Sequence, residues 1–134
     1  MKLTITHFAI IIGLSGLVIT KGYAQTVSPG KKVYDNNCLT CHQADGSGVP
    51  GMNPPLSNVS WVTGDKQKLI QIVLNGLTTP LEIDDEVYHN PMPAHKHLTD
   101  REVADVLTYI RSSFGNKASA VTVEEVKKVR GIKK

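Results

Sequence analysis

The sequence predicts a single all-α domain that follows a short amino-terminal leader. Apolar residues recur at the spacing of a helix in three stretches, which cover residues 30–37, 69–74 and 103–114. A residue type that commonly caps helices precedes each stretch, namely Ser28, Asp65 and Thr99. Segments rich in glycine and proline separate the stretches and predict loops.

Residues 1–24 are typical of a secretory signal peptide. Lys2 begins the segment, an apolar run covers Phe8 to Ile19, and Gly22-Tyr23-Ala24 has small residues where a signal peptidase reads them. An uncleaved membrane anchor is the alternative, but a membrane span takes about 20 apolar residues and this apolar run is shorter. We therefore expect an exported, periplasmic protein whose mature chain does not span the membrane.

The composition of the mature chain excludes some classes of function. The leader carries two of the lysines and no acid, so the net charge falls from +3 to about +1, with 13 basic and 12 acidic residues. This balance does not indicate nucleic-acid binding. About 110 residues remain, enough for one domain at 25–116 with a basic tail at 117–134. We expect a monomer.

The sequence Cys38-Leu39-Thr40-Cys41-His42 predicts a c-type haem attachment site. One helical turn brings both sulfurs to one edge of the porphyrin, where the thiols add to its vinyl groups, and His42 then faces the iron as proximal ligand. A disulfide, half of a zinc site and a redox dithiol are the alternatives. Zinc would need a second pair of ligands, and the chain has no other cysteine. A thioredoxin-like dithiol would need a βαβ context, which the flanking sequence lacks.

Ser28-Pro29 predicts the start of a helix that runs into this motif. The segment from Gly30 to His42, with Tyr34 four residues after the glycine, resembles the amino-terminal helix of class I cytochromes c. The resemblance implies their fold, in which the amino- and carboxy-terminal helices cross around a covalently bound haem. In that family the glycine allows the last helix to cross closely.

Residues 43–63 are expected to form a loop, because three prolines and several glycines interrupt them. Met52-Asn53-Pro54-Pro55-Leu56 resembles the proline loop of the family. The resemblance implies that the Pro54 carbonyl accepts the Nδ1–H of the proximal histidine and that Leu56 packs on the haem. Trp61 is similar in place to an aromatic residue that hydrogen-bonds a haem propionate, and a core tryptophan is the alternative.

A second helix is expected from an Asp65 cap to Asn75. Residues 81–83 and 86–88 then predict a small hairpin across Asp84-Asp85. Its four carboxylates lack the spacing of a calcium loop and predict a solvated acidic turn.

Asn90-Pro91-Met92-Pro93-Ala94 follows fifty residues after the haem histidine. It resembles the methionine loop of small bacterial class I cytochromes, which implies Met92 as the sixth iron ligand. Flanking prolines hold such a backbone extended and leave little to order on binding. The competitors are Met52 and three histidines, His89, His95 and His97.

Thr99 to Glu102 form a capping box, and the apolar stripe from Val103 to Phe114 predicts the last helix of the domain. With Tyr109 this helix resembles the family's carboxy-terminal helix. A second box at Thr122 to Glu125 predicts a short basic helix near Val123 to Arg130, within a solvated tail.

The resemblance implies a one-electron carrier and not an enzyme. With histidine and methionine on the iron, no position remains for a substrate. The carrier would be a soluble shuttle or the cytochrome subunit of an oxidoreductase, and its partners would be redox proteins. A haem-based sensor or a peroxidase-like enzyme with a displaceable sixth ligand is the alternative.

Overall fold

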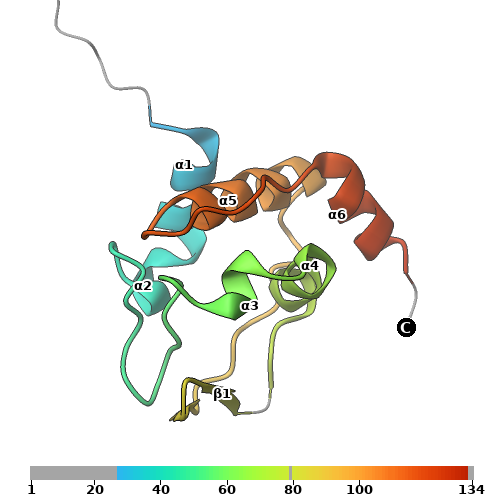
Figure 1. Ribbon diagram of the computed structural model, residues 1–134. Helices are drawn as coiled ribbons and strands as arrows, with labels where there is room; N and C mark the ends of the chain where they lie inside the picture. Colours follow the sequence, from blue (N-terminus) through green and yellow to red (C-terminus); the bar gives the residue numbers. More distant parts are fainter. Residues whose placement is uncertain (1–26, 79, 133–134) are drawn as a thin grey trace, which may run out of the picture.

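A computed structural model describes residues 27–78 and 80–132 of the chain (Figure 1). The predicted signal peptide lies outside the described residues. Six helices and one hairpin occur in this part, in the order α1 (Pro29–Asn37), α2 (Leu39–His42), α3 (Ser60–Thr63), α4 (Lys66–Asn75), β1 (Leu81–Ile83), β2 (Glu86–Tyr88), α5 (Asp100–Ser112) and α6 (Val123–Arg130). None of the helices in this part is long and apolar enough to cross a bilayer.

Four helices begin at the caps that the sequence predicts. The Ser28 hydroxyl accepts a hydrogen bond from the backbone of Lys31, and the Asp65 carboxylate accepts one from the backbone of Lys68. Thr99 and Thr122 each form a complete capping box. These side chains satisfy backbone N–H groups that a helix start leaves free, so each predicted start is confirmed.

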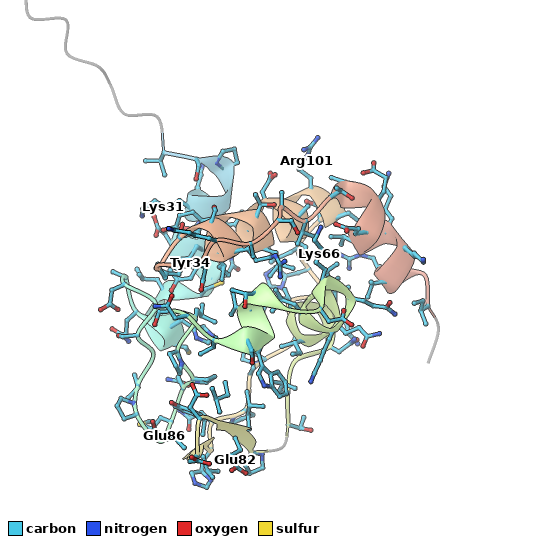
Figure 2. All side chains as sticks on the ribbon, viewed as in Figure 1. Lys31, Tyr34, Lys66, Glu82, Glu86 and Arg101 are labelled. Carbon is cyan, nitrogen blue, oxygen red and sulfur yellow. The ribbon has the colours of Figure 1, made fainter. Side chains whose placement is uncertain are left out.

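Helices α1 and α5 cross in close contact, as the resemblance implied (Figure 1). A Cβ atom on Gly30 would overlap the Asp105 carbonyl oxygen and lie 2.7 Å from Tyr109 Cβ. Tyr34 lies at this crossing (Figure 2), is 1% exposed, and packs its ring 5.5 Å from that of Tyr109 and 5.3 Å from that of Phe114. The crossing therefore requires a residue without a side chain at position 30.

Gly30→Ala is expected to lower the free energy of unfolding by about 1–3 kcal/mol, because the added methyl group overpacks the crossing. At an exposed helical site the same change would stabilise the helix by up to about 1 kcal/mol. Thermal unfolding of the two variants Gly30→Ala and Asn36→Ala, the latter at an exposed position of α1, measures the effect. An unchanged or raised transition temperature for Gly30→Ala would contradict the close crossing.

The core forms around α5, which contacts α1, α3, α4 and α6. The four apolar residues of α4 that were expected to face inward are all buried, namely Leu69, Ile70, Val73 and Leu74. The hairpin is also confirmed, with Leu81 opposite Tyr88 and Ile83 opposite Glu86. Asp84 and Asp85 both adopt positive φ, which a two-residue hairpin turn requires. Among the described residues, no group of three or more His, Cys, Asp or Glu side chains is placed to hold a metal ion.

Two expectations about the remaining segments were wrong. The segment 43–63 is not loop throughout, since Ser60–Thr63 form the helical turn α3. No side chain caps this turn, so the sequence carried no local signal for it. The segment after residue 116 is not simply a solvated tail, because Val121, Val126 and Val129 are buried where α6 contacts α4 and α5. The apolar side of α6 completes the core and its basic side faces the solvent.

Val126→Ala is expected to lower the free energy of unfolding of the haem-bound protein by about 2 kcal/mol, because the Val126 side chain is fully buried. Lys127→Ala, at the next and exposed position, is expected to change it by less than about 0.5 kcal/mol. Denaturant unfolding of both variants makes the comparison. Equal midpoints would mean that α6 does not belong to the cooperative unit.

Candidate haem-binding site

A cavity lies beside the predicted haem motif, with about 1200 Å³ of space free of protein atoms when the open solvent at its mouth is included. Its wall comes from the α1–α2 junction, the proline loop, α3, α4, the hairpin, the methionine loop and α5. The seven residues predicted from the sequence to bind haem all line it: Cys38, Cys41, His42, Pro54, Leu56, Trp61 and Met92. The fold thus brings together residues that are up to 54 positions apart in the chain.

The two cysteines lie at the ends of one helical turn. Cys38 ends α1 and precedes α2, and its carbonyl accepts hydrogen bonds from the backbone of Cys41 and His42 at 3.2 and 2.9 Å. The thiols are free, which argues against the disulfide alternative. Burial, with a smaller contribution from Cys41, raises the pKa of the Cys38 thiol to about 11. Cys41 is exposed. The pair therefore places two sulfurs at the edge of the cavity.

His42 is held in one tautomer by the proline loop. Its Nδ1 atom lies 2.9 Å from the Pro54 carbonyl oxygen, which can only accept a hydrogen bond, so Nδ1 carries the proton. This hydrogen bond is the one that the resemblance implied. Burial lowers the pKa of His42 and the bond to Pro54 partly opposes that shift. A neutral ring with its proton on Nδ1 leaves the Nε2 lone pair free to bind a metal.

Asn116 fixes the proline loop, and the sequence reasoning missed it. Its buried side-chain amide donates to the carbonyl oxygens of Leu56 and Ile110 at 2.8 and 2.9 Å and accepts from the backbone of Asn58. A single asparagine after the end of a helix carries no signal of such contacts, because Leu56 and Asn58 lie 60 and 58 positions away in the sequence. Asn116 thus joins the loop that bonds His42 to the end of α5.

Two backbone hydrogen bonds to Leu77 hold Met92 in place. Its N–H donates to the Leu77 carbonyl and its carbonyl accepts from the Leu77 N–H, each at 2.9 Å. Gly76 lies so close that a Cβ atom there would overlap the Met92 carbonyl oxygen. The half-buried Met92 is therefore fixed against the end of α4 as part of the cavity wall.

The other candidates for the sixth iron ligand differ in whether they line the cavity. Met52 is 49% exposed and does not line the cavity. His89 and His97 are exposed and also lie outside its wall. His95 does line the cavity, with its backbone N–H bonded to the Val73 carbonyl. His95 is therefore the geometric competitor to Met92 for the sixth position.

Trp61 is half-buried in the cavity wall, and the Nζ atom of Lys68 lies 3.6 Å from the centre of its ring. This distance is typical of a cation–π contact. The contact holds the indole in place, and a bond to a haem propionate stays a prediction.

The donor set and the lining of this cavity fit a c-type haem. Apart from its sulfurs and imidazoles, the wall is mostly apolar, with a large share from Leu56, Val59, Val62, Leu69, Ile72, Val73, Val106, Leu107 and Ile110. A porphyrin needs such an apolar slot, two thiols for covalent attachment, and nitrogen or sulfur ligands for its iron. Neither a zinc site nor a redox dithiol would use all of these groups.

Comparisons with known proteins agree with the geometry. The cytochrome c family model matches residues 27–114. Cytochrome c-552 of Thermus thermophilus is 33% identical over 129 residues, which cover 90% of this chain and 86% of the relative. Two other relatives are much longer proteins, which this chain matches over 22% and 24% of their length. They are the cytochrome c subunits of a quinone alcohol dehydrogenase from Gluconobacter oxydans, 37% identical, and of a gluconate 2-dehydrogenase from Pantoea cypripedii, 38% identical.

The crossed helices, the family match and the Cys-x-x-Cys-His motif lead to one identification. The chain belongs to the cytochrome c family, as an electron-transfer protein of the class I fold that binds one haem c covalently through Cys38 and Cys41.

Proposed function

We propose that this protein is an exported one-electron carrier in which His42 and Met92 bind the haem iron. The observation that carries the proposal is that both residues line one apolar cavity together with Cys38 and Cys41. Bound haem c supplies a one-electron couple between ferric and ferrous iron. The chain itself holds the ligands and excludes water.

The two ligands are held in place by different parts of the fold. The Pro54 carbonyl fixes the ring of His42, and the Leu77 backbone fixes Met92. Ligands that are already positioned need little rearrangement when the iron changes oxidation state, which suits rapid electron transfer. A thioether ligand also favours ferrous iron and raises the reduction potential.

A carrier, and not an enzyme, follows from this ligand set, because His42 and Met92 would leave no iron position for a substrate. The named relatives are a cytochrome c-552 and the cytochrome c subunits of two dehydrogenases. We therefore propose redox proteins as partners. The carrier is either a free monomeric shuttle or the subunit of a larger oxidoreductase. The predicted leader at 1–24 supports a periplasmic location.

The far-red absorption spectrum of the oxidised protein tests the proposal. We expect a weak charge-transfer band from the thioether to ferric iron, together with a reversible one-electron titration. A spectrum without this band and with histidine ligation would point to His95. Binding of carbon monoxide to the reduced protein without loss of structure would instead favour the sensor or peroxidase-like alternative.

A further inference from the structure

Arg111, in the last turn of α5, is a buried cation close to the haem cavity. It is 2% exposed, and with Asn116 it is one of two buried polar or charged residues in the described part of the chain. Its Nε atom donates to the Ser119 carbonyl at 2.7 Å, and its Nη1 atom donates to the carbonyls of Val62 and Gly64 at 2.6 and 3.1 Å. The guanidinium thus joins α5 to the end of α3 and to the segment before α6.

No carboxylate side chain of the described residues forms an ion pair with Arg111. Within residues 27–78 and 80–132, the four ion pairs involve Lys31, Lys66, Arg101 and Arg130, and none involves Arg111. Arginine keeps its proton at any pH that the fold tolerates. Three backbone carbonyls accept hydrogen bonds from its Nε and Nη1 atoms, but their dipoles cannot cancel a full unit of charge. A buried arginine without an acidic partner is unusual, because removing an ion from water is costly.

The charge stands directly behind the cavity wall. Val62, which accepts the shortest of the three hydrogen bonds, lines the cavity, and so does Ile110, the residue before Arg111. Charges that are buried in this way are screened by salt much less than those on the surface, and the low dielectric constant strengthens their field.

We propose that Arg111 is a fixed positive charge that raises the reduction potential of the haem. When an electron arrives from a redox partner, the iron is reduced and the net charge of the haem falls by one unit. The Arg111 guanidinium disfavours the more positive oxidised form and therefore favours reduction. The proposal rests on the electron-carrier function and on covalent haem, and it holds whichever residue is the sixth ligand.

Redox titration of the purified haem protein tests this proposal, with optical detection of both oxidation states. Arg111→Gln is expected to shift the midpoint potential downward. Arg111→Lys keeps the charge but cannot reach three carbonyls, so it should lower the unfolding temperature while holding the potential near that of the wild type. The two variants thus separate the effect of the charge on the potential from the effect of the hydrogen bonds on stability.

A third variant tests the charge without removing the arginine. Ser119 is exposed and its backbone carbonyl bonds Arg111, so Ser119→Asp adds a negative charge at the residue that contacts the guanidinium and should also lower the potential. This variant decides the question if Arg111→Gln does not fold. Arg101→Gln and Gln67→Glu make the same charge changes at exposed sites, and Arg101 points away from the molecule (Figure 2).

Potentials of Arg111→Gln and Ser119→Asp that shift no more than those of the two surface controls would overturn the proposal and leave Arg111 a structural residue. An unchanged far-red band in all variants would show that the shift does not come from a change of ligand. A wild-type protein without a reversible one-electron couple would instead overturn the electron-carrier function itself.

Discussion

Replacing both haem cysteines, Cys38→Ala with Cys41→Ala, is expected to yield an exported chain without a cooperative thermal transition. The cavity that would then stay unfilled is walled by residues of the core, among them Val62, Leu107 and Ile110. Empty apolar space costs about 24 cal/mol per Å³, so the roughly 120 Å³ of this cavity that water could occupy would cost about 3 kcal/mol if it stayed empty. The wall would also lose its apolar contacts with the porphyrin, and both losses are large against the roughly 5–15 kcal/mol that stabilises a domain. The haem therefore completes the core.

Circular dichroism in the near and far ultraviolet, followed during heating, measures this effect. Thr40→Ala is the matched control, because Thr40 lies between the two cysteines and is exposed. We expect the control to bind haem and to unfold in one sharp transition. A sharp transition and a fixed near-ultraviolet signal in the haem-free double variant would show that the protein core is sufficient without haem.

Met92→Ala is expected to abolish the far-red band of the oxidised protein and to lower its reduction potential. The thioether is a soft ligand that stabilises ferrous iron, so its loss favours the ferric form. The backbone of residue 92 is bonded to Leu77 on both sides and does not depend on the side chain. The altered spectrum would then report the ligand and not an unfolded loop.

Met52→Ala is the control for this experiment. Met52 is exposed and lies outside the cavity wall, so its removal is expected to leave the band and the potential unchanged. If Met92→Ala keeps the native spectrum, the assignment of Met92 is wrong. His95→Ala then becomes the deciding variant, because His95 is the competing ligand that lines the cavity.

The helix starts could be predicted from the sequence because each depends on residues within four positions. Ser28, Asp65, Thr99 and Thr122 satisfy N–H groups of their own first turn, whatever the rest of the chain does. The haem motif is local in the same sense, since one turn of helix sets the positions of its two sulfurs and its imidazole. The hairpin turn followed from two residues, Asp84 and Asp85.

The short helix α3 could not be predicted in this way. It has no capping side chain and begins inside a segment whose prolines and glycines indicate a loop. Neighbouring elements hold it, and the Arg111 guanidinium bonds the carbonyls of Val62 and Gly64 at its end. The packing of α6 could not be predicted for a similar reason. Its basic residues indicate only its exposed face, and no local pattern shows that its buried valines pack against α4 and α5.

The sequence by itself determined the all-α class, the helix starts and the residues of the haem motif, because local hydrogen bonds and short spacings decide them. Only the tertiary structure decided that α6 closes the core, that His95 lines the cavity where Met52 does not, and that Asn116 and Arg111 are buried. These facts depend on contacts between different elements of the fold, such as Arg111 with Val62, 49 positions away, and Asn116 with Leu56, 60 positions away. Burial and electrostatic environment belong to the assembled fold, and no local pattern of residue types encodes them.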